Sequence, residues 1–372
     1  MKIFHTADLH IGKTFTRYGT ISTDLMEARR SGLDRLVQLA NEYECDILVI
    51  AGDLFDRPKV AARDVMRAAK SLAAFEGTAV LVLPGNHDHT GLHESIWHHF
   101  TANCAPHTLL HTDASPVTIA DGLPSALVFH PAPCDAKTSE THRLPSDPIQ
   151  ADGLHIGIAH GSVEGFTPDL QGRYFPMTVD QLQSTGIPLW LLGHTHVPFD
   201  MGMSGGGRIL NPGTPEPDDI TSAHPGYAFL ISIEPTLGPG TAAVEVSQVP
   251  TGQYRFRRTV VEELAGPKAI STLLDVTKDV DSYTVQELAV RARVTAEERE
   301  ELTRIVTDLE RRAAWCSVDL SGLREQITAE RINALFAEQS FEHRLLSDLM
   351  RTGDEHALQR AFELLQEARN DV

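Results

Sequence analysis

The fold is decided by the stretch Asp46-Ile47-Leu48-Val49-Ile50-Ala51-Gly52-Asp53-Leu54-Phe55-Asp56. Residues 46–51 form a short apolar run after their first residue, which is typical of a strand buried on both faces of a sheet. Gly52 and Asp53 follow at once, so the carboxylate of Asp53 is expected at the end of that strand, pointing into a cleft. A buried strand that ends in Gly-Asp indicates an α/β protein whose polar chemistry lies at the strand ends.

The same arrangement is found on both sides of this stretch. Residues 2–7 form an apolar strand that leads into Asp8, and residues 78–83 form another that ends in Pro84-Gly85. Helical periodicity over about 23–43 and 60–75 separates the three strands. This order predicts an α/β layer. A β-rich region follows, with strands expected over 117–120, 126–130, 154–159, 188–192, 208–210, 227–233 and 242–249.

Seven side chains able to bind metals lie in five short blocks, and nearly every block begins or ends with Gly. They are Asp8, His10, Asp53, Asn86, His160, His194 and His196. Oxygen and nitrogen ligands without thiolates suit manganese, iron or zinc better than a structural zinc knot. The set therefore predicts a two-metal hydrolase, and two-metal sites mostly cleave phosphate esters.

The spacing within the blocks favours shared coordination. Asp8 and His10 are two residues apart, so at a strand end both can face one side and bind one ion. Asp53 has two carboxylate oxygens and can bridge two ions. His194 and His196 flank one residue, so each can reach a different ion.

These blocks carry a family resemblance. The order Asp-x-His, Gly-Asp-x-x-Asp-Arg, Gly-Asn-His-Asp, His-Gly and Gly-His-x-His resembles the calcineurin-like metallophosphoesterase family. Residues 4–13, 51–58 and 211–216 resemble its DNA repair exonuclease branch, whose bacterial form is the SbcD nuclease subunit. The similarity covers about 1–260 and implies a metallophosphoesterase β-sandwich flanked by helices.

The resemblance also assigns roles. It implies that one metal is held by Asp8, His10, Asp53 and His196, and that the other is held by Asp53, Asn86, His160 and His194. His87 would act on the leaving oxygen as a proton donor or charge stabiliser. Asp56 would orient the His87 imidazole through its carboxylate. The predicted cofactors are two divalent metal ions, with manganese preferred over iron, zinc or magnesium.

The resemblance implies a manganese-dependent DNA exonuclease or endonuclease that acts in double-strand break repair. In this branch the nuclease subunit works as a homodimer with an SMC-like ATPase of the SbcC type, and DNA is the substrate. The alternative is a phosphoesterase acting on a small-molecule or protein phosphate ester with the same centre. An inactive scaffold would have lost a ligand, and none of the seven is missing.

The net charge of −19 argues against DNA as a partner. Its distribution weakens this objection, because residues 1–100 carry only −2 while residues 101–200 carry −7 and residues 263–372 carry −8. A nucleic-acid face could form around five basic residues near the first metal blocks. They are Lys13, Arg17, Arg57, Lys59 and Arg63. Strong nonspecific binding by this chain alone is not expected, because it rests on many phosphate contacts.

The composition changes near residue 262. Residues 263–372 are polar, rich in Glu, Arg, Leu and Ala, and carry three apolar stripes at helical spacing. Two domains are therefore predicted, a phosphoesterase domain over 1–262 and a helical domain over 263–372. The helices suit docking of a partner or of DNA, and they equally suit a self-contained bundle.

A cytoplasmic location is expected. No hydrophobic signal segment precedes the first strand, and no run is long enough to span a bilayer, so no membrane association is expected. The four cysteines show no paired spacing and are interpreted as free thiols in a reducing compartment.

Overall fold

The chain divides into two compact units, Met1–Arg257 and Arg258–Val372. The structure is a computed structural model, and it describes residues 1–91, 95–146, 148–149, 153–166, 171–204, 206–222, 224–235, 242–263 and 266–370. The division falls before the boundary predicted at residue 262, because β13 (Arg255–Glu262) belongs to the sheet of the second unit. Residues 264 and 265, next to the predicted boundary, lie outside the described part.

The first sheet contains the buried strand that precedes Gly52 and Asp53. Its strand order is β12-β11-β1-β2-β3-β4, and β1 to β4 run parallel. The strands are β1 (Lys2–Thr6), β2 (Ile47–Ala51), β3 (Ala79–Leu83), β4 (Thr108–Leu110), β11 (Tyr227–Pro235) and β12 (Ala242–Pro250). Because parallel strands point the same way, the carboxyl ends of β1, β2 and β3 meet at one edge.

The second sheet has the order β5-β6-β7-β8-β10-β9, in which β6, β7, β8 and β10 run parallel. Its strands are β5 (Val117–Ile119), β6 (Leu127–Ala132), β7 (Leu154–His160), β8 (Leu189–Gly193), β9 (Phe199–Gly202) and β10 (Arg208–Asn211). Apart from β4 and β9, which were not predicted, the strands of both sheets follow the ranges predicted from sequence to within a few residues.

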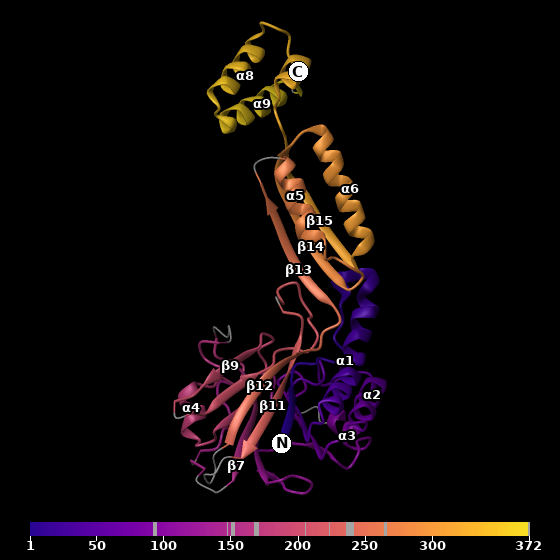
Figure 1. Cartoon of the computed structure of the whole chain (residues 1–372), viewed down its shortest axis with the longest axis vertical. Coiled ribbons are helices and arrows are strands. Elements are labelled where there is room, and N and C mark those ends of the chain that lie inside the picture. The colour runs from indigo at the N-terminus through magenta and orange to yellow at the C-terminus, as the bar shows by residue number, and fades with distance from the viewer. Residues whose placement is uncertain are drawn as a thin grey trace. The chain divides into compact units, whose positions relative to one another are not determined.

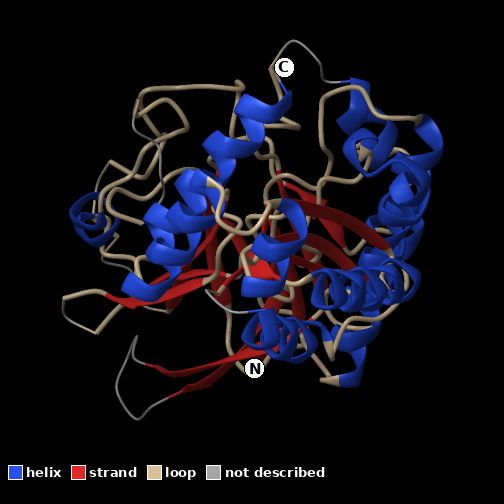
Figure 2. Ribbon diagram, turned by 90° about the horizontal axis from the view of Figure 1, so that it is seen from above, coloured by secondary structure: helices blue, strands red, loops and turns tan. Residues whose placement is uncertain are grey.

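The two sheets pack face to face, with helices on their outer faces. Ile47 and Val49 of β2 share one apolar core with Phe129 and Ile156 of the second sheet. Leu48 and Ile50 point the other way. They pack under the helices α1 (Ser22–Glu42), α2 (Ala62–Leu72) and α3 (Ser95–Thr101), and the short 3-10 helix η1 (Thr16–Ile21) precedes α1. On the other side, α4 (Val179–Ser184) covers the second sheet (Figures 1 and 2). The predicted β-sandwich flanked by helices is confirmed.

The second unit combines helices with a small sheet. α5 (Gly266–Thr277) and α6 (Ala296–Arg312) share a core with β14 (Thr284–Val294) and β15 (Trp315–Glu325), which run parallel beside β13. A bundle of α7 (Ala329–Leu335), α8 (Phe341–Thr352) and α9 (Glu355–Asn370) follows, with its own apolar cluster. The C-terminal helices are present as predicted, and β13, β14 and β15 are an addition that the composition did not indicate.

Among the described helices of the chain, none combines the length and apolar character that a membrane span requires.

Candidate metal centre

The five predicted blocks lie at the carboxyl ends of five strands. Asp8 follows β1, Asp53 follows β2 and Asn86 follows β3, while His160 ends β7 and His194 follows β8. The first three strands belong to one sheet and the last two to the other. The site therefore lies where the same edges of both sheets meet, as the strand-end pattern predicted.

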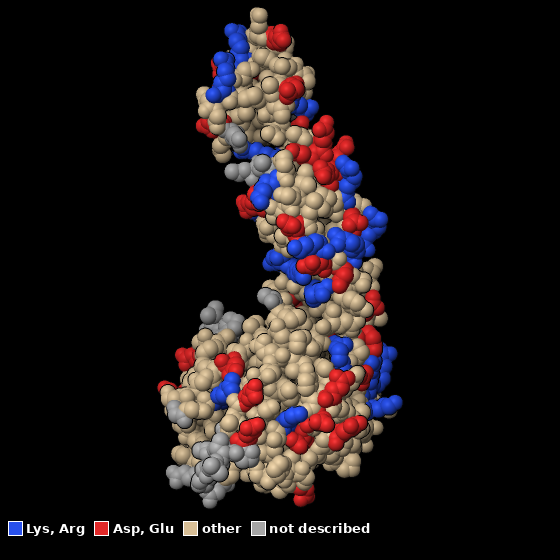
Figure 3. Space-filling view, in the orientation of Figure 1, with Lys and Arg blue, Asp and Glu red and all other residues tan. Residues whose placement is uncertain are grey.

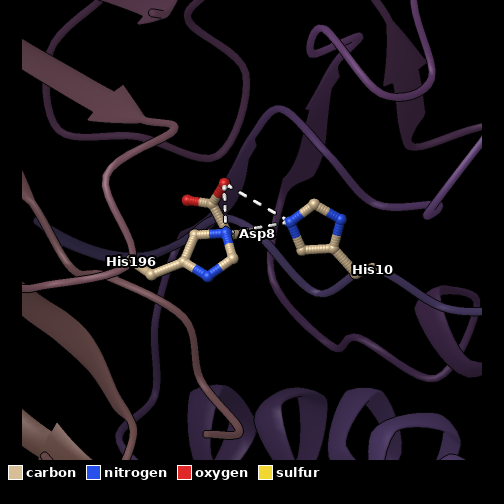
Figure 4. A group of neighbouring side chains, drawn as sticks. All are labelled: Asp8, His10 and His196. Atoms are coloured by element: carbon tan, nitrogen blue, oxygen red, sulfur yellow. Dashed lines mark hydrogen bonds and ion pairs between the residues drawn. The ribbon is translucent and has the colours of Figure 1, made fainter. Parts of the chain in front are cut away.

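One group of ligands contains Asp8, His10 and His196. Their side chains point toward one another in Figure 4. Oδ1 of Asp8 lies 3.9 Å from Nε2 of His10 and 3.9 Å from Nε2 of His196. The two imidazole Nε2 atoms are 3.1 Å apart. Three donor atoms thus converge on a single point, although the two histidines are separated by 186 positions in the sequence.

A second group contains Asn86, His160 and His194. Oδ1 of Asn86 lies 3.1 Å from Nε2 of His160 and 3.1 Å from Nδ1 of His194. Asp53 joins the groups, because its Oδ2 is 3.2 Å from Nε2 of His160 and 3.7 Å from Nε2 of His10. All seven predicted ligands are therefore brought together, with Asp53 between the two groups.

The backbone at the ligands is strained. Asp8, His10, Asp53 and His194 all have positive φ angles, of 57°, 47°, 51° and 97°. Non-glycine residues rarely adopt this conformation, and it is concentrated at functional sites, where surrounding structure enforces it. The turns after the strands thus aim these side chains inward at a cost in backbone energy.

Two of the glycines that precede candidate ligands lie where a side chain would not fit. A Cβ on Gly52, whose φ is 93°, would lie 2.0 Å from Nδ1 of His160. A Cβ on Gly85 would lie 2.2 Å from Oδ1 of Asp53. Both positions therefore exclude larger residues, since the ligand side chains occupy that space.

His87 lies beside the first group but is held differently from the prediction. A nitrogen of His87 lies within 4.8 Å of ligand atoms of His10 and Asp53. Its Nδ1 is 3.0 Å from the main-chain carbonyl of Asp56. The Asp56 carboxylate points elsewhere, with Oδ1 3.9 Å from Nδ1 of His10 and Oδ2 3.4 Å from Arg57. The expected carboxylate contact is thus corrected to a carbonyl contact, because the turn after β2 presents the main chain.

Asp88 is fully buried and braces two metal loops. Its Oδ1 accepts a hydrogen bond from the N–H of Gly85 at 2.7 Å, and its Oδ2 accepts one from the N–H of Phe55 at 2.9 Å. Burial raises the pKa of Asp88 to about 8, opposed by those two hydrogen bonds. Asp88 is therefore a structural neighbour of the site and not a ligand.

Asp218 is a site residue that the sequence analysis missed. Its buried carboxylate lies 3.5 Å from Nδ1 of His196 and 3.3 Å from the guanidinium of Arg29, and it pairs with Lys13. A carboxylate on Nδ1 leaves Nε2 of His196 for a metal. The only sequence signal was its position two residues after the conspicuous segment 211–216.

The electrostatics of the cluster are those of a cation site. Burial raises the pKa of Asp8. Burial would also lower the pKa of His160, but the Asp53 carboxylate outweighs it and raises that pKa to about 9. His160 in turn lowers the pKa of Asp53, against the effect of its own burial. Charge is thus concentrated in a buried place, which is costly unless cations neutralise the carboxylates.

The donor set fits two divalent ions. Carboxylate, amide and imidazole donors form two groups that share one carboxylate oxygen, as a two-metal site requires. The nearby thiol of Cys134 is no ligand, because it donates to the main-chain carbonyl of His160 at 3.2 Å.

The family model described as calcineurin-like phosphoesterase matches residues 1–198, more than half of the chain. The chain belongs to this family. Members of the family are metal-dependent phosphoester hydrolases with a two-metal centre. This is the chemistry that the two groups of candidate ligands indicate. The resemblance seen in the sequence motifs is confirmed at the family level.

Two curated relatives are each about a quarter identical to this phosphoesterase over the aligned residues. The DNA double-strand break repair protein Mre11 of Methanopyrus kandleri is 25% identical over 261 residues, which cover 62% of this chain and 53% of the relative. The uncharacterized metallophosphoesterase YhaO of Bacillus subtilis is 25% identical over 211 residues, covering 53% and 48%. The chain spans about half the length of these relatives.

A solved structure, TT1561 of Thermus thermophilus, superimposes with a TM-score of 0.41 at 12% identity. The match covers 66% of this chain and 98% of TT1561.

Proposed function

We propose that this phosphoesterase is a manganese-dependent phosphodiesterase that cleaves DNA as an exonuclease or endonuclease in double-strand break repair. The observation that carries the proposal is the position of Asp53 between two complete ligand groups, at 3.2 Å from His160 and 3.7 Å from His10. When bound, two such ions lower the pKa of a water nucleophile and stabilise charge on the phosphoryl oxygens.

In this proposal His87 serves the leaving group. The contact between its Nδ1 and the Asp56 carbonyl requires an N–H at Nδ1, because a carbonyl only accepts. The ring is thereby fixed, and Nε2 is the atom that can hold a proton for the leaving oxygen.

DNA as the substrate is supported by the similarity to the Mre11 protein and by the motifs around Asp8 and Asp53. Of the five basic residues expected to form a nucleic-acid face, Arg17, Arg57, Lys59 and Arg63 are exposed. Lys13 is instead paired with Asp218, and Arg57 donates to the carbonyl of Gly12. Four of the five residues are therefore accessible to solvent, and Lys13 is the one held by a buried carboxylate.

The second candidate is a phosphoesterase acting on a small-molecule or protein phosphate ester. The charge distribution favours it, because residues 101–200 carry −7 and Lys and Arg are mixed with Asp and Glu over the surface seen in Figure 3. A protein that grips DNA by itself usually makes many phosphate contacts with Lys and Arg. The metal centre would be the same in both cases.

We extend the proposal to partners. The nuclease would act as a homodimer with an SMC-like ATPase of the SbcC type, docked on the bundle α7–α9. Phe341 of α8 is 69% exposed and Leu364 of α9 is 48% exposed, so apolar surface is available there. The four cysteines are free thiols, which fits the cytoplasmic location included in the proposal.

The substrate is tested with a panel of esters in the presence of manganese. Linear duplex DNA, single-stranded DNA, bis-p-nitrophenyl phosphate and p-nitrophenyl phosphate are each incubated with the full chain and with the variant Asp53→Ala. Cleavage of DNA and of the diester, lost in the variant, is the expected result. Hydrolysis of the diester or monoester without cleavage of DNA supports the second candidate.

The partner is tested by copurification with the full chain. An ATPase with a long coiled coil, identified by mass spectrometry, should be retained by the wild-type protein and released by Phe341→Asp. Retention that is equal in both proteins argues against docking on this bundle.

A further inference from the structure

An exposed aromatic side chain lies against the metal centre. The ring centroid of Tyr174 is 5.4 Å from that of His194, with an angle of 34° between the ring planes. Tyr174 is 38% exposed, whereas His194 belongs to the second ligand group. An aromatic surface open to solvent therefore borders the place where a phosphate ester is cleaved.

The backbone around Tyr174 is anchored on both sides. Its carbonyl accepts a hydrogen bond from the N–H of Ser162 at 2.8 Å, and the N–H of Phe175 donates to the carbonyl of Ser139 at 3.0 Å. Phe175 is buried and has a positive φ of 51°. Because Ser162 comes two residues after the ligand His160, the position of Tyr174 is tied to the metal centre.

A second aromatic pair lies on segments that follow ligand residues in the sequence. The rings of Phe166 and Phe199 lie 5.4 Å apart at 34°, and Phe166 is 46% exposed. Phe199 comes three residues after His196 and packs against the apolar cluster on the outer face of the second sheet. Tyr174, whose ring contacts that of His194, is called the aromatic rim below.

The region that supplies the rim is poor in cationic side chains. Residues 101–200 contain three Lys and Arg against ten Asp and Glu. One of the three, Arg143, is paired with Asp135. This stretch can therefore supply few phosphate contacts to a nucleic-acid strand, whereas stacking on an aromatic ring needs no positive charge.

We propose that the aromatic rim binds an unpaired nucleobase next to the scissile phosphate, with Tyr174 as the stacking platform. The preferred substrate is then a single-stranded or frayed strand. Bases within a duplex are already stacked on their neighbours and offer no free face without being unpaired. This inference rests on the proposed function, since a phosphodiester at the metal centre is what places a base at the rim.

The test measures binding without turnover. The manganese-loaded His87→Ala protein is titrated with a short single strand carrying 2-aminopurine beside each internal phosphate, and its fluorescence is followed. Stacking on Tyr174 should quench the probe. Adding Tyr174→Ala should weaken affinity for the strand about tenfold, within the range expected for loss of one base–aromatic stack.

Two matched variants control this result. Tyr174→Phe keeps the ring and should bind like the parent. Tyr43→Ala removes a tyrosine of equal exposure, 39%, which ends α1 before β2 begins and so lies at the opposite end of that strand from Asp53. A strand of the same length with abasic sites should bind equally to all four proteins.

The outcomes separate this inference from the proposed function. If Tyr174→Ala binds the normal strand as tightly as the parent protein does, the inference is overturned, even where diester hydrolysis persists. Tyr174-dependent binding of a blunt duplex as tight as that of the single strand also overturns it. If the wild-type protein does not hydrolyse the diester, the proposed function is wrong instead. Should Tyr174→Ala fail to fold, an unquenched probe on the parent protein still decides against stacking.

Discussion

The main-chain N–H of His87 donates a hydrogen bond of 2.8 Å to Oδ1 of Asp53. The other oxygen of the same carboxylate faces both ligand groups. Asp53 therefore ties the loop that carries the proposed proton donor to the point shared by the two metals.

Asp53→Ala should remove both ions, because each ligand group loses the donor that they share. Elemental analysis of the purified variant should find almost no bound metal, while circular dichroism shows an intact fold. An analysis that still gives two metals per chain would refute the bridging role of Asp53.

His87→Ala should retain two metals and lose most of its turnover. A general acid typically contributes about 10²–10⁴-fold to the rate, so kcat should fall by that order. Diester hydrolysis and metal content are measured together, with His99→Ala, an exposed histidine of α3, as the matched control. If the variant keeps nearly the normal rate, His87 is not the general acid.

Asp56→Ala separates two explanations of how His87 is oriented. The orienting atom in the structure is the main-chain carbonyl, which alanine keeps. We expect kcat to stay within about threefold of the wild type, against the 10²–10⁴-fold loss when a general acid itself is removed. A loss as large as that of His87→Ala would show that the carboxylate is required after all.

Metal binding should release a proton from His160. In the metal-free protein Asp53 raises the pKa of His160 to about 9, so the imidazole is protonated at neutral pH and must lose that proton to bind a metal. The apparent affinity should therefore rise as pH rises toward 9, by about tenfold per pH unit for each proton released.

Calorimetry provides the measurement of this release. Titrations with manganese at pH 7 in two buffers of different ionisation enthalpy should give different heats, from which the number of protons follows. Identical heats in both buffers contradict the predicted protonation of His160.

Asp218→Asn should weaken binding at the group formed by Asp8, His10 and His196. The carboxylate on Nδ1 orients the His196 imidazole, and loss of such a partner typically costs roughly 10–100-fold in metal affinity. Asp219→Asn is the matched control, because that carboxylate accepts hydrogen bonds from Thr221 instead. If metal titration gives the same affinity for both variants, Asp218 does not orient His196 for metal binding.

Much of the sandwich could be predicted from the sequence because its buried strands are short apolar runs with Gly and a polar ligand after them. β2 is the example, since each of its residues is buried and Asp53 follows within two positions. The strands of the second unit were harder to predict. Leu288, Val290, Ala292 and Val294 alternate with exposed or half-buried residues in β14, but the Glu- and Arg-rich composition around them favours a helix equally well.

The seven candidate ligands could be predicted from the sequence alone, because each lies in a short block of polar residues at the end of an apolar strand, and nearly every block has a glycine beside it. The residues that orient these side chains and the neighbouring His87 were identified only in the tertiary structure. Asp218 contacts His196, and the main-chain carbonyl of Asp56 contacts His87. Neither contact follows from the spacing of residues in the sequence. The physical reason is that strand and turn patterns are local, whereas the partner of a buried polar atom is chosen by the packing of distant segments.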